Sequence, residues 1–498
     1  MDSKTAKKVD YIRLLSATRR RESRGPSTRT LAMHAASDRG RVLFSTAFRR
    51  LQSKTQVFPQ EWNAAVRTRL THSLEVASIG RYVAEQISVD LLRRGELGER
   101  PRDMANAFVT FVEVACLMHD LGNPPFGHFG EASIQEWFST RAEVFKEKFD
   151  PSVQDDFDTL FQDFSHFDGN PQGFRLAVRL QWAKDEFGYN LTLTQLAALL
   201  KYPWTPDRIG ATQDGVTIKK AGVFHSEAEI LTEIQTTLGL APNCRHPLTY
   251  IMEAADDISY CLSDIEDALE KKVVRDQDVI TALRQGLSEL PTSNRLAQQM
   301  LNTLPDSDAS EIDSAWFTDF RTASTNILVK RTRTLYSTSQ KEIEQGKYFS
   351  LLRNSPAARA LLTVVEKFSK KNLYTCSVVR ERELVGYQVI SGILDKFGIL
   401  LELDTKSATE LLVEGKPPRD KGMALAPTLW SFLPKKHLKV YAHTIEGHRT
   451  TFGEDHPKYR LLEWMARAHL IVDFLSGMTD DFSIVTYRRL YDGGTRQL

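Results

Sequence analysis

Four side chains suited to metal binding or proton transfer lie within one short stretch, residues 115–131. A mostly apolar run ends in His119 and Asp120, and a loop rich in Gly and Pro follows at once. That loop carries a second histidine, His128, and the carboxylate of Glu131 three residues further on. Gly and Pro are poorly tolerated inside helices and strands, so we expect a rigid turn that presents these side chains. Imidazole and carboxylate groups can hold a divalent cation or move a proton.

Two other stretches add ligands of the same kind. His72 lies in residues 61–95 and the adjacent acids Asp256 and Asp257 lie in residues 246–272, and both stretches have apolar residues at helical spacing. A lone His-Asp pair is weak evidence, because a hydrogen-bonded pair in a polar loop has the same two letters. Together, two imidazoles and several carboxylates without thiolates predict a site for a divalent cation rather than a structural zinc site. Water would complete its coordination.

The elements that position these residues are expected to be helices, because few stretches alternate with the period of a strand. The fold class is therefore predicted to be mainly α. We expect residues 1–40 to be a partly ordered basic arm, residues 148–170 an acidic loop and residues 203–224 an irregular excursion. Helices are expected over residues 61–95, 104–119, 131–147, 173–201 and 246–272, with further amphipathic helices over 275–498.

The strings around these residues are more specific than the ligands alone. The order His72, His119-Asp120, Asp256 resembles the HD-domain phosphohydrolase superfamily. The chain is similar in particular to the bacterial deoxyguanosinetriphosphate triphosphohydrolases, from about residue 38 to the Ser-Gly-Met-Thr-Asp string near the C-terminus. The resemblance is carried by residues 48–58, 67–75, 118–131, 252–260, 390–392 and 476–480. With the basic arm before its start, this predicts an N-terminal arm over 1–37, an HD-type helical core over 38–275 and a helical C-terminal region over 276–498 that packs on the core as one continuous domain.

The resemblance implies hydrolysis of dGTP, or of other dNTPs, to a deoxynucleoside and inorganic triphosphate with a divalent metal, Mg, Mn or Co. The metal ligands would be His72, His119, Asp120 and one of the two adjacent acids. The family has a tyrosine four residues after that ligand, a spacing that Asp256 and Tyr260 satisfy and Asp257 does not. A four-residue step also places both side chains on one helical face. We therefore assign Asp256 to the metal and a structural role to Asp257.

The resemblance also assigns residues to catalysis and to the substrate. His128 and Glu131 match the catalytic pair, in which the histidine handles a proton and the carboxylate orients it and favours its charged form. Val57 matches an apolar residue at the ribose 2′ carbon, where an added hydroxyl would lack hydrogen-bond partners, so ribonucleotides would be disfavoured. The other predicted substrate contacts are Arg69, Lys201, Lys220 and Tyr260 for the phosphates, Gln56 and Asn170 for the sugar and base, and Asp264 for the nucleoside.

Composition limits the compartment and the partners. The 498-residue chain is 41% hydrophobic with a net charge of +1, so no global field favours nucleic acid. The four cysteines form no CxxC pair, and we expect them to be reduced thiols. Because the N-terminus lacks an apolar leader and no run approaches the roughly 18 apolar residues of a membrane span, we expect a cytoplasmic protein. The resemblance implies a homohexamer and possible binding of single-stranded DNA.

Two alternatives remain open from the sequence. One is a different HD phosphohydrolase, such as a nucleotidase or a guanosine-tetraphosphate hydrolase. The other is a nucleotide-sensing or single-strand-binding protein that is not an enzyme, against which the intact metal-type and His128 residues argue. The basic arm, residues 330–333 and Lys435-Lys436 keep DNA binding open as an added property. Product analysis separates the readings, because only a triphosphohydrolase releases intact tripolyphosphate. The preferred dNTP and the native metal also stay open.

Overall fold

The described part of the chain is mainly helical, which confirms the predicted fold class. The computed structural model describes residues 8–22, 28–58, 63–182, 184–306, 312–313, 315–414 and 424–491. Within these ranges the strands form one antiparallel hairpin, β1 (Thr212–Gln213) and β2 (Val216–Thr217). It lies in the stretch predicted to be an irregular excursion.

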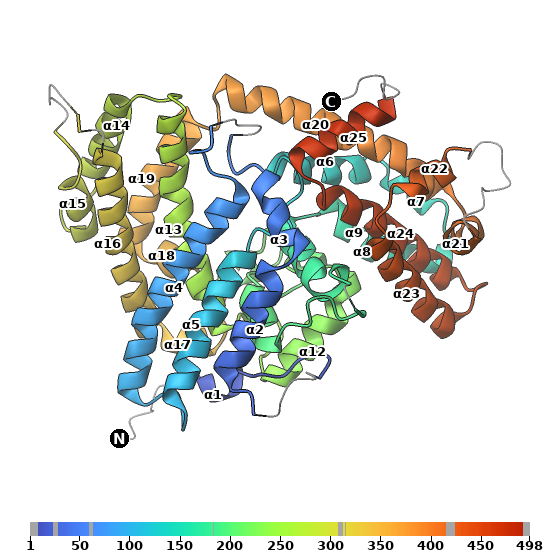
Figure 1. Cartoon of the computed structure of the whole chain (residues 1–498), viewed down its shortest axis with the longest axis horizontal. Helices are drawn as coiled ribbons and strands as arrows, with labels where there is room; N and C mark the ends of the chain where they lie inside the picture. Colours follow the sequence, from blue (N-terminus) through green and yellow to red (C-terminus); the bar gives the residue numbers. More distant parts are fainter. Residues whose placement is uncertain are drawn as a thin grey trace.

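Long helices packed side by side form the first hydrophobic core, on the left of Figure 1. They are α2 (Leu31–Leu43), α4 (Arg69–Arg94), α5 (Pro101–Met118), α13 (Pro247–Glu270) and α16 (Trp316–Thr338). Shorter elements complete it: α1 (Tyr11–Leu14), α3 (Thr46–Arg50), α10 (Gly169–Arg175), α11 (Leu193–Leu199), α12 (Ala228–Leu238), α14 (Asp276–Ser288), α15 (Arg295–Leu301), α17 (Gln340–Glu344), α18 (Leu351–Asn354) and α19 (Pro356–Asn372).

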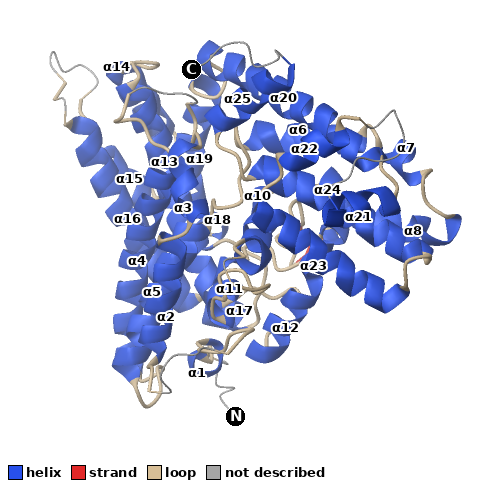
Figure 2. Cartoon of the chain, turned by 45° about the vertical axis from the view of Figure 1, so that its right-hand side comes forward, coloured by secondary structure: helices blue, strands red, loops and turns tan. Residues whose placement is uncertain are grey.

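A second core, rich in aromatic rings, is formed by the segment after the Gly-Pro loop and by the C-terminal helices. Its elements are α6 (His128–Ser139), α7 (Ala142–Lys146), α8 (Gln154–Leu160), α9 (Gln162–Ser165), α20 (Ser377–Phe397), α21 (Thr405–Glu414), α22 (Ala426–Ser431), α23 (Lys435–Phe452), α24 (Pro457–Ser476) and α25 (Asp480–Tyr491). Figure 2 shows loops running between the long bundle and this group.

Buried polar side chains join the two cores. The Lys54 ammonium donates to the carbonyl oxygens of Asn123, 2.5 Å away, and Ser476, 2.7 Å away. The Arg175 guanidinium, on α10, donates to the Asp473 carboxylate on α24 at 2.9 Å. Hydrogen bonds of this kind are directional, so they fix how one core sits against the other.

The approach of α4 to α5 depends on a glycine. A Cβ atom on Gly80 of α4 would lie 2.4 Å from the Cys116 sulfur on α5, a distance at which one of them must move. Thr68 caps the N-terminus of α4, and α5 ends at Met118. The close packing therefore brings His72, in the first turn of α4, near the residues that follow α5.

Several sequence expectations differ from the structure. The single helix expected over 131–147 is two helices, α6 and α7. The acidic stretch 148–170 contains α8 and α9, because its phenylalanines pack into the second core. The single helix expected over 173–201 is broken: α10 runs into a π-helical turn, Leu176–Leu180, and α11 begins only at Leu193. In the basic arm, Tyr11 and Leu14 of α1 are buried and Arg19 forms a buried ion pair with Asp38 at 2.5 Å, so this part of the arm packs against the first core.

One helical stretch, Val379–Glu402, is long and apolar enough to cross a membrane by length and composition. The expectation that no run approaches this length is therefore wrong for these residues. Of its most apolar window, 56% is buried inside the protein, and Ile390, Leu394 and Phe397 belong to the second core. We attribute its hydropathy to core packing.

We expect Gly80→Ala to lower the free energy of unfolding by about 1–3 kcal/mol, the usual cost of overpacking a core. Adding Cys116→Ala makes room for the new methyl group, so the double variant should lose less stability than the sum of the single variants. Gly40→Ala on α2 is the matched control, because a Cβ there meets nothing within 4 Å. Thermal and urea unfolding of the unsubstituted protein, the two single variants, the double variant and the control measure these changes. Additive losses of stability in the double variant would contradict the packing argument.

Candidate active site

A cavity of ≈ 780 Å³ is lined by residues of both cores. Every predicted site residue lines it except Asp264, which lies behind its wall. The lining includes Gln56, Val57, Arg69, His72, His119, Asp120, His128, Glu131, Asn170, Lys201, Lys220, Asp256 and Tyr260. The structure thus gathers side chains from more than 200 residues of sequence into one pocket.

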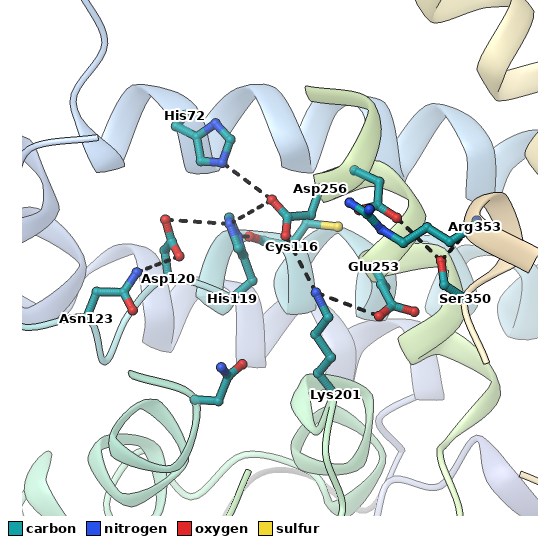
Figure 3. A network of polar contacts seen from close by, with 12 residues as sticks. His72, Cys116, His119, Asp120, Asn123, Lys201, Glu253, Asp256, Ser350 and Arg353 are labelled. Carbon is teal, nitrogen blue, oxygen red and sulfur yellow. Dashed lines mark hydrogen bonds and ion pairs between the residues drawn. The ribbon is translucent and has the colours of Figure 1, made fainter. Parts of the chain in front are cut away.

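His72, His119 and Asp256 form a group that could hold a metal ion (Figure 3). One ligand atom from each lies within 4.8 Å of the others. The Nε2 atoms of both histidines are 3.5 Å from the same carboxylate oxygen, Oδ1 of Asp256. Burial raises the pKa of Asp256, but His119, His72 and Lys201 outweigh it and hold the pKa below its usual range. The carboxylate is therefore available as an ionised ligand.

The hydrogen bonds of His119 prepare it for a cation. Its Nδ1 atom is 2.7 Å from the carbonyl oxygen of Cys116, a contact that requires the proton on Nδ1. The Nε2 atom is buried and has no hydrogen-bond partner among the described residues. A backbone carbonyl that fixes the tautomer of a metal-binding histidine is a common feature of metal sites. The residues present therefore fit a divalent cation.

Asp120 lies beside this group rather than within it. Its Oδ2 atom is 3.7 Å from the Nε2 atom of His119 but accepts a 2.6 Å hydrogen bond from Arg69. Asn123 donates to its other oxygen at 2.7 Å. The position of Arg69 in turn needs a glycine at 127, where φ is +57° and a Cβ would lie 2.6 Å from the guanidinium. The assignment of Asp120 as a ligand stays a prediction.

Asp257 points away from the metal group. Its carboxylate accepts hydrogen bonds of 2.7 and 3.1 Å from Arg353 on α18. Burial raises the pKa of Asp257 to about 6, although Arg353 and Lys201 lower it. Of the two adjacent acids, the one with the Tyr260 spacing therefore faces the imidazoles.

His128 and Glu131 form a hydrogen-bonded pair at the start of α6. The Nδ1 atom of His128 is 2.7 Å from Glu131, whose other oxygen accepts the N–H of Gly169 at 2.8 Å. The Glu131 side chain is 7% exposed and that of His128 is 77% exposed, so an anchored acid carries an accessible imidazole. The hydrogen bond to Glu131 raises the pKa of His128 more than burial lowers it. The imidazole is thereby biased toward its charged form.

The predicted phosphate-binding cations are all held by carboxylates. Lys201 is 3.7 Å from Glu253 and 3.9 Å from Asp256, and Lys220 is 2.6 Å from Asp168. Burial lowers the pKa of Lys201, but Tyr202, Glu253 and Asp256 outweigh it and raise the pKa. Both ammonium groups are therefore charged near neutral pH.

At the other end of the cavity three side chains share hydrogen bonds. The Tyr374 hydroxyl is 2.6 Å from the Tyr260 hydroxyl and donates to Asp264 at 2.5 Å. Burial raises the pKa of Asp264 to about 7, while the bond from Tyr374 lowers it. Because Asp264 is bonded to Tyr374 and does not line the cavity, we place it behind the cavity wall.

Sequence reasoning missed several residues of the cavity wall. Tyr202 directly follows the predicted Lys201 and could have been found by that adjacency. Arg353, Tyr374, Arg382 and Glu383 also line the cavity. Arg353 and Tyr374 lie outside the strings that carry the resemblance, so no motif signals them.

Comparisons with known proteins identify the family of this chain. Residues 69–157, which include His72, His119 and Asp120, match the model of the HD domain. The chain is 36% identical over 484 residues to a deoxyguanosinetriphosphate triphosphohydrolase of Salmonella schwarzengrund, covering 91% of this chain and 92% of the relative. It is 35% identical over 512 residues to the protein of that name from Klebsiella pneumoniae subsp. pneumoniae, covering 97% of this chain and 99% of the relative. The chain therefore belongs to the deoxyguanosinetriphosphate triphosphohydrolase family of the HD-domain superfamily.

Proposed function

We propose that this protein hydrolyses dGTP to deoxyguanosine and inorganic triphosphate with the help of a divalent cation. The observation that carries the proposal is one cavity that combines a metal-type group, a separate acid–base pair and several cations. The activity for which relatives that match nearly the whole chain are named supports the choice of dGTP. Its place in the cell would be the cytoplasm, and its assembly a homo-oligomer, a hexamer by resemblance.

The metal would be held by His72, His119 and Asp256, with Asp120 as a further ligand once Arg69 releases it. A bound cation supplies charge stabilisation for a phosphate oxygen and lowers the pKa of a coordinated water. Mg, Mn or Co fits the mixture of carboxylate and imidazole donors. The side chains of the cavity must supply the binding, the orientation and the proton transfer.

His128 is proposed as the general acid for the leaving 5′ oxygen. Its imidazole is accessible, its charged form is favoured by Glu131, and Glu131 is fixed by the Gly169 amide. Protonation of the leaving oxygen avoids an alkoxide when the bond to the α-phosphorus breaks. Glu131 acts through His128 and is a positioning residue.

The remaining walls are proposed to bind the substrate in two parts. Arg69, Lys201 and Lys220 would meet the charge of the triphosphate, together with Tyr260. Gln56, Val57 and Asn170 would contact the sugar and base. Asp264, expected from the sequence to face the nucleoside, would instead support the wall formed by Tyr260 and Tyr374. Because Val57 offers no hydrogen-bond partner, a ribose 2′ hydroxyl would be disfavoured.

The direct test is chromatography of the products formed from the four dNTPs and GTP with Mg, Mn and Co. We expect dGTP to give deoxyguanosine and intact tripolyphosphate, and GTP to react much more slowly. Release of single phosphates or pyrophosphate would indicate another HD phosphohydrolase. Tight binding of nucleotide or single-stranded DNA without turnover would instead support a sensor.

The paired acids provide a test of the metal group. Asp256→Asn should lose bound metal and turnover together, because it removes a carboxylate that both imidazoles face. Asp257→Asn is the matched control on the next residue: it should retain metal, and its loss of the Arg353 contact should appear mainly as reduced stability. Metal content by mass spectrometry and thermal unfolding decide between them. The reverse pattern would mean that the wrong carboxylate was assigned.

Proton transfer can be separated from metal binding at His128. His128→Ala should keep its metal and bind dGTP, while turnover falls by roughly 10²–10⁴, the usual contribution of a general acid. Activity of the unsubstituted enzyme should decline as pH rises through the raised pKa of His128. In Glu131→Gln that decline should move to lower pH, because the group that raises the pKa is gone. Near-normal turnover of His128→Ala would refute the assignment.

A further inference from the structure

Two segments that carry cavity residues run antiparallel to each other and are joined by an ion pair at each end. At the cavity end, Asp168 is 2.6 Å from the Lys220 ammonium. At the far end, Asp163 accepts hydrogen bonds from the ring of His225 at 2.8 Å and from its backbone N–H at 2.9 Å. Between these pairs the rings of Phe167 and Phe224 stack with centroids 6.0 Å apart. We call residues 163–170 and 220–225 the two arms of a clamp.

The cavity end of the clamp contacts three predicted site residues. While one oxygen of Asp168 holds Lys220, the other accepts the backbone N–H and the side-chain amide of Asn170, at 2.9 and 2.5 Å. The intervening residue, Gly169, donates its N–H to Glu131. A single tripeptide therefore fixes a phosphate-binding cation, a sugar-binding amide and the partner of the proposed acid.

The far end of the clamp is anchored in the second core. The other oxygen of Asp163 is 3.1 Å from the Nε2 atom of His469 on α24. Asp163 is 2% exposed, whereas Asp207, which lies 3.3 Å from the outer nitrogen of His225, has a side chain that is 47% exposed. The inner contact is thus shielded from water and the outer one is not.

At the cavity end of the clamp, the charges of Asp168 and Lys220 depend on each other. Burial lowers the pKa of Lys220, but Asp168 and Glu131 outweigh it and raise the pKa. The Asp168 side chain is 7% exposed, so its charge needs the ammonium as a partner. An ammonium has three donors on a flexible four-carbon stem, so one bond to Asp168 restrains the stem and leaves donors for a ligand.

We propose that Asp168 is a positioning residue that holds Lys220 in place for the triphosphate, and that Asp163 and His225 close the other end of the same clamp. The proposal rests on the proposed function, since it takes the triphosphate as the ligand of Lys220. Without Asp168, the lysine side chain would have to be ordered each time the ligand binds, which weakens binding.

The two reaction products probe the two ends of the cavity separately. In Asp168→Asn, which retains an oxygen for Asn170, we expect metal-loaded enzyme to bind inorganic tripolyphosphate roughly 3–10-fold more weakly, the cost of ordering one long side chain. Binding of deoxyguanosine should be unchanged. Calorimetry measures both affinities. Equal loss for both products would indicate general damage, and no loss for tripolyphosphate would overturn the proposal.

A double variant tests whether Asp168 acts through Lys220. Lys220→Met alone should weaken tripolyphosphate binding, and adding Asp168→Asn should weaken it no further. Asp207→Asn is the matched control, because it removes only the exposed partner of His225 and should leave both affinities unchanged. An additional loss in the double variant would show that Asp168 acts independently of Lys220.

Hydrogen exchange tests the clamp without any ligand, so its result stands even if the enzyme fails to hydrolyse dGTP. Asp168→Asn and His225→Gln should each speed amide exchange in both arms, residues 163–170 and 220–225, whereas Asp207→Asn should not. Exchange that increases in only one arm would show that the segments are not coupled. Absence of dGTP hydrolysis with coupled exchange would contradict the proposed function and leave the clamp standing.

Discussion

The packing of α13 against α4 and α5 places a carboxylate, Asp256, among two imidazoles inside the protein, and the rest of the site depends on how that charge is compensated. Burying an ionised carboxylate is costly unless charges or hydrogen bonds offset it. Here His72, His119 and Lys201 keep it ionised. Gly80 permits the close packing of α4 against α5 about two turns beyond His72, and His119 directly follows α5.

The same principle extends through the cavity, where several of the cations already contact an acidic partner. Arg69 contacts Asp120, Lys220 contacts Asp168, and Arg353 contacts Asp257. Such pairing keeps the cations charged and oriented in a partly buried site. At these side chains a polyanionic ligand must therefore bind cations that already contact a carboxylate, either by sharing the cation with the carboxylate or by displacing it. Selectivity for a triphosphate then depends on geometry as well as on net charge.

Site residues could be predicted from the sequence where their signal is local. They were missed where it depends on contacts between segments far apart in the chain. His119, Asp120, His128 and Glu131 lie in one continuous string, and Asp256 is identified by a spacing within one helix. Arg353 and Tyr374 were missed because they reach the cavity only through contacts between helices about 100 residues apart. The phenylalanines at 157, 161 and 164 do lie at helical spacing and contact one another as well as Trp464 on α24. The acidic residues between them led instead to the prediction of a loop. The helical fold class, which depends on local periodicity, was predictable.

The polar junction between the two cores has a consequence for how this sequence can diverge. Apolar side chains inside each core can be exchanged for others of similar volume at modest cost. The contacts of Lys54 with two carbonyl oxygens, and of Arg175 with Asp473, tolerate no such exchange, because an unpaired buried partner would remain. Over evolutionary time, substitutions should therefore accumulate within the cores while the junction between them, and with it the width of the cavity, stays constant.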